Sequence, residues 1–226
     1  MFHDLLNLFY PRICHICESI LVQNEHVICT NCIHELPVTN FSAHNENPVE
    51  KVFYGRVEIE QATSLLFFHK KSKVQKLIHQ LKYRGYKEIS TFLGTWMGDE
   101  IIEHGLMREV DAIIPVPLHR KKLKSRGFNQ VENFGKEIAN KLEVPYLDTV
   151  LLKKSSTTTQ TLKARLSRWG NIEEAFVIAN PHLIKDLHIL LVDDIITTGA
   201  TLEACSAALK EAGCLKISIA SMAIAV

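Results

Sequence analysis

The sequence predicts an α/β fold, in which helices flank a parallel sheet that follows a small cysteine-rich segment. Three observations support this prediction. Residues 189–213 read as a buried strand, a hydroxyl-rich loop and an amphipathic helix, which is the repeating unit of such folds. Other apolar runs alternate along the chain with segments of helical periodicity. Four of the six cysteines form two Cys-x-x-Cys pairs near the N-terminus.

Composition and charge indicate a globular protein without a membrane span, whose basic residues lie mostly after residue 50. A chain of 226 residues with 46% apolar residues can bury a sizeable core, and no apolar run approaches the roughly 20 residues that span a bilayer. The N-terminus lacks the pattern of a secretory signal, so we expect a cytoplasmic protein. Residues 1–50 hold one basic and six acidic residues, which leaves 25 of the 26 basic and 19 of the 25 acidic residues for the remainder. We therefore expect any anion site in the larger part.

The paired cysteines predict a structural zinc site. Eleven residues separate the two pairs, and each pair can present two thiolates to one tetrahedral metal ion. Four thiolates complete the coordination shell, so the metal would stabilise the segment rather than catalyse, and a redox pair is the alternative. We expect a zinc ribbon at 1–45, a polar linker at 40–51 and a larger domain at 52–226. The expected ligands are Cys14, Cys17, Cys29 and Cys32.

The first part of the larger domain predicts two strands and then two helices. Residues 52–70 are rich in β-type residues around a glycine break, which is typical of two strands. Residues 72–83 show helical apolar spacing with an N-terminal serine cap and a terminating glycine, and 88–103 form a second amphipathic segment. Lys82 and Tyr83 read as the exposed end of the first helix.

A further apolar strand, 111–117, leads into the most basic window of the chain. A charge run is usually a solvated face. This window, however, follows a strand expected in the same parallel sheet as residues 189–192, so it would open at the same edge and neutralise a bound anion there. The five cations are Arg120, Lys121, Lys122, Lys124 and Arg126.

Beyond the basic window we expect a helix at 130–142 and strands at 177–189 and 216–226. Residues 153–170 are polar, basic and hydroxyl-rich, without a steady apolar period. A long segment of this kind inside a compact domain is more often functional than accidental. We expect it to form a lid over a ligand, with an approaching cation among Lys154, Arg165 and Arg168.

The strand at 189–192 ends in two adjacent carboxylates, which favour hydroxyl donors or a cation as partners. Three threonines supply hydroxyl groups at the start of the following helix, and a glycine lets a ligand approach the backbone. Such a site suits a phosphate with a vicinal diol one sugar away. The alternative is a plain strand–helix turn with a threonine cap and solvated aspartates. The residues concerned are Asp193, Asp194, Thr197, Thr198, Gly199 and Thr201.

Residues 190–201, LLVDDIITTGAT, resemble the phosphoribosyl pyrophosphate (PRPP) signature of type I phosphoribosyltransferases. The resemblance implies a type I phosphoribosyltransferase-like sheet, with Asp193 and Asp194 holding the ribose 2- and 3-hydroxyls and Mg²⁺ accompanying PRPP. Neither GxxxxGK[ST] nor GxGxxG occurs in the chain. The resemblance places the 5-phosphate in the loop that contains Ile195, Thr197, Thr198, Gly199, Ala200 and Thr201.

As a whole, the sequence resembles the ComF family of bacterial competence-associated phosphoribosyltransferase-like proteins. The resemblance implies a contribution to DNA uptake during natural transformation. The partners it implies are PRPP or a related phosphosugar, single-stranded DNA, and a DNA-uptake helicase or other competence proteins. It rests on the Cys₄ segment, LKYRGY at 81–86, PVPLHRKKLKSRGFNQ at 115–130, Gln160 with Arg168 and Asn171 ahead of Ala175-Phe176, and the PRPP signature.

Two functions of different classes fit these residues. The first is an enzyme that transfers the phosphoribosyl group of PRPP to an unidentified nitrogen acceptor and releases pyrophosphate, which needs positioning and charge stabilisation rather than a protein nucleophile. The second is a non-catalytic PRPP sensor or single-stranded DNA-handling module that uses the basic window and the 153–170 segment on phosphates. The sequence shows no acceptor pocket and leaves both functions open.

Overall fold

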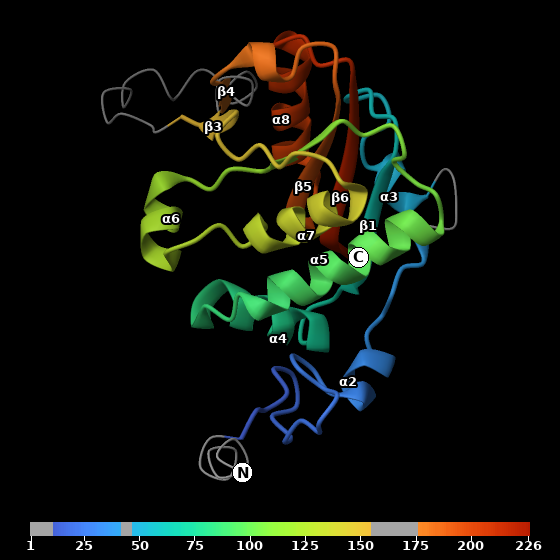
Figure 1. Cartoon of the computed structure of the whole chain (residues 1–226), viewed down its shortest axis with the longest axis vertical. Helices are drawn as coiled ribbons and strands as arrows, with labels where there is room; N and C mark the ends of the chain where they lie inside the picture. Colours follow the sequence, from blue (N-terminus) through green and yellow to red (C-terminus); the bar gives the residue numbers. More distant parts are fainter. Residues whose placement is uncertain (1–10, 42–46, 155–175) are drawn as a thin grey trace.

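A computed structural model describes residues 11–41, 47–154 and 176–226. Its centre is a sheet of four parallel strands in the spatial order β1, β6, β5, β2 (Figure 1). The strands predicted at 111–117, 189–192 and 216–226 are confirmed. The four strands span Ala62–Phe68 (β1), Ala112–Pro115 (β2), His188–Ile196 (β5) and Lys216–Ala225 (β6).

The inner strands of the sheet are buried on both faces, as their continuous apolar runs indicate. Along β5, Leu190 and Val192 belong to one apolar cluster, whereas Ile189 and Leu191 belong to another. Because consecutive side chains of a strand reach opposite faces, the sheet separates these two clusters. The same alternation applies to Asp193 and Asp194, which also lie in β5.

Helices cover both faces of the sheet, and Figure 1 shows α5 and α7 crossing in front of the strands. The helices predicted at 72–83, 88–103 and 130–142 are confirmed, although the first continues as a π-helical turn, η2 (Gln80–Arg84). No helix within the described ranges is long and apolar enough to cross a membrane. The main helices are α4 (Lys73–His79), α5 (Glu88–Glu103), α7 (Glu132–Leu142) and α8 (Ala200–Glu211).

The segment before β1 differs from the prediction. Of the two strands expected over residues 52–70, only β1 forms, and turns follow a short helix, α3 (Pro48–Lys51). The Asn47 side chain caps α3 by accepting hydrogen bonds from the N–H groups of Val49 and Glu50 at 2.9 and 3.2 Å. Part of the expected linker is therefore helical, because the Asn47 cap stabilises the first turn of α3. The residues after α3 form turns in spite of their β propensity.

The strand predicted at 177–189 lies outside the main sheet. Instead, β4 (Phe176–Ile178) pairs antiparallel with β3 (Leu151–Lys153), and a 3₁₀ turn, η4 (Pro181–Leu183), leads to β5. The two short strands flank residues 155–175. The lid predicted at 153–170 begins with Lys153 of β3 and Lys154, and the rest of it, with Arg165 and Arg168, lies outside the described residues.

The cysteine-rich segment contains α2 (Thr30–His34) and packs on the larger part. Its apolar residues share one cluster with those of α4 and α5. After α2 the chain runs antiparallel to the edge strand β1, where the N–H of Thr39 donates to the carbonyl of Leu65 at 3.1 Å. Ion pairs from α4 join Lys73 to Glu35 at 2.5 Å and Lys76 to Glu18 at 3.2 Å. The division into domains at 1–45 and 52–226 remains a prediction.

Candidate functional site

Unpaired backbone N–H groups gather in the loop between β5 and α8. Three residues intervene, and among the described residues the N–H groups of Thr197, Thr198 and Gly199 have no hydrogen-bond acceptor. The first turn of α8 adds further unpaired N–H groups and the positive end of the helix dipole. These donors are suited to holding a phosphate.

The loop itself is shaped by Gly199. This residue has a φ of +74°, and a Cβ atom there would lie 2.7 Å from Val52 Cγ1 and 3.1 Å from Phe53 Cε1. Backbone conformation and packing therefore both require glycine. The loop encloses a shallow concavity of about 40 Å³, lined by Asp193, Ile195, Ile196, Thr197, Thr198, Gly199, Ala200, Thr201 and Leu202. The structure thus brings the sequence-predicted loop residues together.

The two aspartates point to opposite faces of the sheet, because both lie within β5. Asp194 reaches the face of α4 and η2, where its Oδ2 lies 2.7 Å from the Nζ of Lys82. The two side chains are only 18% and 17% exposed. Asp194 is therefore already neutralised by a partner, and a sugar hydroxyl or metal ion at this carboxylate has to share it with the ammonium group.

Asp193 reaches the other face, where it approaches Cys205 of α8 and Lys153 of β3. Burial raises the pKa of the Asp193 carboxyl to about 7, with a further upward contribution from Asp194. The backbone N–H of Asp194, which donates to Asp193 Oδ1 at 2.8 Å, and the two nearby lysines oppose this rise. The Asp193 carboxyl therefore titrates near neutral pH.

Lys82 is a residue of the candidate site that sequence reasoning alone missed. From the pattern it reads as the exposed end of a helix, whereas its side chain turns inward to Asp194. The π-helical turn η2 carries it, and Gly85, in the left-handed conformation with φ 76°, ends that turn. Only the resemblance of LKYRGY to the ComF family marked this position.

The basic window forms an exposed helix, α6 (Arg120–Arg126). Arg126 donates to Gln130 Oε1 at 2.6 Å and lies 5.5 Å from the Tyr83 ring centroid. Within the described parts of the chain, Lys121, Lys122 and Lys124 have no ion-pair partner. These lysines are placed on a solvated face, and no described contact joins them to the loop after β5.

Arg120 of the basic window lines a cavity with a volume of about 530 Å³. Pro115, at one wall, pairs with Val192, the neighbour of Asp193, so the cavity adjoins the same edge of the sheet. Sequence reasoning found no such pocket, because its walls come from four separate segments. They are Pro115, Pro117, Leu118, Arg120, Leu123, Asn129, Glu132, Tyr146, Asp148, Leu151, Leu152 and Lys153.

The four predicted cysteine ligands meet in space. The sulfur atoms of Cys14, Cys17, Cys29 and Cys32 all lie within 4.8 Å of one another, and the Cys17 and Cys29 sulfurs are 3.6 Å apart. A tetrahedral Zn²⁺ with Zn–S bonds of about 2.3 Å separates its sulfurs by about 3.8 Å. The arrangement therefore fits a metal ion such as zinc.

Hydrogen bonds around the cysteines also favour thiolates. The N–H groups of Ile16 and Cys29 donate to the Cys14 sulfur at 3.4 and 3.3 Å. Hydrogen bonds from Ser19 lower the pKa of Cys17 to about 6. Burial, together with the surrounding cysteines, raises the pKa of Cys32. A cation among these sulfurs would offset the repulsion that opposes ionisation of all four.

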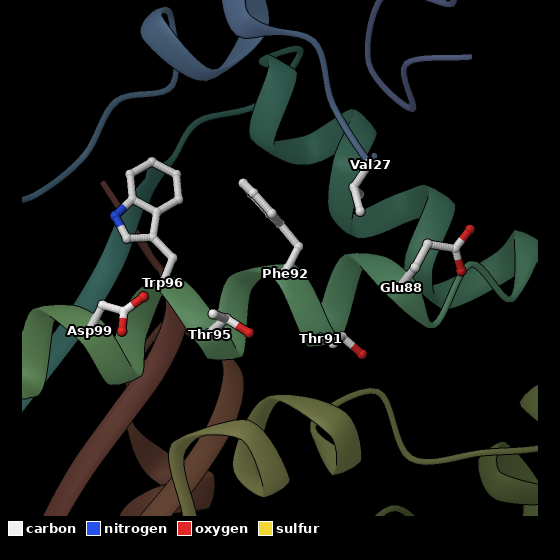
Figure 2. Close-up of a pocket in the computed structure, with 7 residues that line it drawn as sticks. All are labelled: Val27, Glu88, Thr91, Phe92, Thr95, Trp96 and Asp99. Carbon is white, nitrogen blue, oxygen red and sulfur yellow. The ribbon is translucent and has the colours of Figure 1, made fainter. Parts of the chain in front are cut away.

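A second hollow, of about 420 Å³, lies away from the strand ends, between α5 and the cysteine-rich segment (Figure 2). Figure 2 shows the side chains of Phe92 and Trp96 standing on the same face of α5. The acidic groups at its rim are engaged, since Glu88 pairs with His15 at 3.1 Å and Asp99 pairs with Lys141. Nothing at this hollow indicates a particular ligand chemistry.

Comparisons with known proteins agree with this geometry. The phosphoribosyl transferase domain family matches residues 132–224, which run from α7 into β6 and include the loop after β5. Competence protein F of Haemophilus influenzae is 32% identical over 114 residues, which is 50% of this chain and 50% of that protein. DNA utilization protein YhgH of Salmonella typhimurium is 28% identical over 207 residues, 86% of this chain and 88% of that protein.

Among solved structures, an adenine phosphoribosyl transferase from Trypanosoma brucei aligns over 69% of both chains with 15% identity and a TM-score of 0.40. A relationship to the ComF family of phosphoribosyltransferase-like proteins is supported by the domain match, the sequence relatives, the parallel sheet and the four clustered cysteines.

Proposed function

We propose that the chain binds PRPP together with Mg²⁺ and transfers its phosphoribosyl group to a nitrogen nucleophile, releasing pyrophosphate. The observation that supports this most is the set of three consecutive N–H groups, at Thr197, Thr198 and Gly199 before α8, that have no acceptor within residues 11–41, 47–154 and 176–226. They offer the 5-phosphate directional donors at the positive end of a helix. The match to the phosphoribosyl transferase domain includes these residues.

The remaining groups of the site suit the rest of PRPP. Although their side chains leave opposite faces of β5, Asp193 and Asp194 are adjacent at the end of the strand that leads into the loop, where they would accept hydrogen bonds from the ribose hydroxyls. Lys82 would orient the Asp194 carboxylate. Mg²⁺ commonly binds substrate phosphates with one or two carboxylates, and it would supply charge neutralisation on the departing pyrophosphate. The protein's own part is to fix the sugar and exclude alternative orientations.

The cavity beside Arg120 supplies room for the reaction partners. Its volume of about 530 Å³ lies in the range of small-molecule sites. Arg120 and Lys153 bring positive charge to its walls, whereas Glu132 and Asp148 offer acceptors to an N–H-bearing nucleophile. We assign this cavity to the acceptor and the departing pyrophosphate.

Pyrophosphate release tests the proposal. The protein is incubated with PRPP and Mg²⁺, alone and with panels of purine, pyrimidine and amine nucleophiles, and free pyrophosphate is measured by an enzyme-coupled assay. Release that depends on one nucleophile and stops on chelation of Mg²⁺ supports transfer. If PRPP with Mg²⁺ neither raises the melting temperature nor gives heat in calorimetry, the site assignment is wrong.

Binding should also depend on the pH through Asp193. Since the pKa of the Asp193 carboxyl is about 7, about half of the free protein carries this group protonated at pH 7, and the carboxylate binds hydroxyl donors or a cation more tightly than the protonated group does. We expect binding of ribose 5-phosphate to be tighter at pH 8 than at pH 6, by up to about tenfold. Calorimetry of wild type and Asp193→Asn at both pH values checks this. Protonation of the ligand's phosphate affects both proteins equally, so a difference in pH dependence between them reports on Asp193. Equal pH dependence in the two proteins would contradict it.

A second candidate function, single-stranded DNA binding, is favoured by the surface next to α6. Tyr83 is 66% and Tyr86 37% exposed, and Arg126 of α6 lies 5.5 Å from the Tyr83 ring centroid. Aromatic rings among cations can stack bases while neutralising phosphates. The names of two relatives refer to competence and to DNA utilization, which agrees with such a role.

The test replaces Lys121, Lys122 and Lys124 with alanine and measures single-strand affinity at several salt concentrations. At roughly 0.7 counterions released per phosphate, the loss of three contacts should reduce the salt slope by about 2. A control replaces three exposed lysines elsewhere, Lys51, Lys70 and Lys185. No binding by wild type at about 50 mM salt, or equal losses in both variants, would rule out this surface.

A further inference from the structure

Arg56 forms a hydrogen bond with the backbone of the loop that follows β5. It lies in the turn after α3, and its Nη1 donates to the carbonyl of Thr198 at 2.6 Å and to that of Val52 at 3.1 Å. Its Nη2 forms an ion pair with Glu203, in the first turn of α8. One guanidinium thus joins the loop, the helix behind it and the turn against which Gly199 packs.

The contact with Thr198 fixes the direction of the next N–H group. A trans peptide is planar, so the carbonyl of residue 198 and the N–H of residue 199 point in opposite directions. Because Arg56 holds the Thr198 carbonyl on its own side, the Gly199 N–H is directed away from Arg56, where no described residue accepts its hydrogen bond. Without the guanidinium, this peptide would be free to rotate toward water.

We propose that Arg56 is a positioning residue that presets the Gly199 N–H for a phosphate without touching the phosphate itself. The inference rests on the proposed binding of a phosphosugar at this loop. Glu203 completes the arrangement by orienting the guanidinium fork toward the loop. Preorganisation of this kind improves affinity by removing the cost of ordering the loop during binding.

If Arg56 only stabilised the fold, its loss would lower the melting temperature of the free protein. The Arg56 and Glu203 side chains are 34% and 32% exposed, and ion pairs with such access to solvent contribute little to stability. Loss of Arg56 should therefore leave the melting temperature of the free protein nearly unchanged. The effect should appear in ligand affinity instead.

Calorimetry with ribose 5-phosphate, and with PRPP and Mg²⁺, on the full chain separates these roles. We expect Arg56→Met to weaken both ligands about tenfold and Glu203→Gln to weaken them two- to threefold. Arg56→Lys, which retains the charge but not the fork, should fall between these two variants. Arg108→Met is the matched control, because Arg108 is an exposed arginine before β2, at the opposite end of the sheet, and its affinities should equal those of wild type.

The outcomes are distinguishable. Weakened binding by Arg56→Met, with the melting temperature of the free protein retained, supports the inference. Wild-type affinity in Arg56→Met overturns it while leaving the proposed function intact. If Arg56→Met does not fold, the pair Arg56→Lys and Glu203→Gln decides, and wild-type affinity in both overturns the inference. Failure of wild type to bind either ligand overturns the proposed function and this inference with it.

Discussion

An Asp193→Asn, Asp194→Asn double variant is expected to lose the rise in melting temperature that PRPP with Mg²⁺ gives wild type. A hydrogen bond from a sugar hydroxyl to a carboxylate contributes about 1.5–3 kcal/mol but one to a neutral amide only about 0.5–1.5 kcal/mol, so replacing both carboxylates weakens binding by about 2–3 kcal/mol, or roughly 30- to 150-fold. Asparagine retains the shape of both side chains, and differential scanning fluorimetry with and without ligand checks the result. Asp186→Asn, at the other end of β5, is the control, and its ligand-induced shift should equal that of wild type.

The two single variants should differ in their effect on the stability of the free protein. Asp193→Asn removes a carboxyl whose pKa is raised by burial, so it relieves an unfavourable charge at neutral pH and should not lower the melting temperature. Asp194→Asn leaves the largely buried Lys82 without its partner at 2.7 Å, and this should destabilise the free protein. A ligand-induced shift that persists in the double variant would show that the phosphosugar binds elsewhere.

Local patterns in the sequence predicted the parts of the site that depend on nearby residues. The strand, loop and helix around Gly199 follow from a buried apolar run and helical spacing within 25 residues. The cysteine cluster likewise follows from two short spacings, each of which places two sulfurs about one metal ion. Both are confirmed as local arrangements, the first by β5 and α8 and the second by the distances between the sulfur atoms.

The parts that were missed depend on distant residues. Arg56 and Thr198 are 142 positions apart, and nothing in the turn after α3 indicates which carbonyl it will meet. Lys82 reaches Asp194 because a π-helical turn rotates it toward the sheet, a rare geometry that apolar spacing does not predict. The sequence predicts a strand that includes Val177 but not its partner, because β propensity does not specify which strand it pairs with, and the structure pairs Phe176–Ile178 with β3.

The largest effect on stability is expected at the cysteine cluster, where we expect wild type to bind a metal ion and a Cys14→Ser, Cys29→Ser double variant to bind none and to melt at a lower temperature. A ligand at a thousand times its dissociation constant stabilises the folded state by about 4 kcal/mol. For a chain of this size, that loss lowers the melting temperature by roughly 8–16 °C. Metal content by mass spectrometry of the purified protein and calorimetric melting check both parts of the prediction.

The loss should extend beyond the cysteine-rich segment, because its apolar residues share a cluster with α4 and α5, and ion pairs such as Lys73–Glu35 join it to α4. Hydrogen exchange in α4 should therefore accelerate in the variant, while that in α8, on the other face of the sheet, should change less. Cys205→Ala is the control, since this buried cysteine lies outside the cluster and its removal should leave the metal content unchanged. One equivalent of metal retained in the double variant, or an unchanged melting temperature after its loss, would show that the four sulfurs do not hold the segment together through a shared ion.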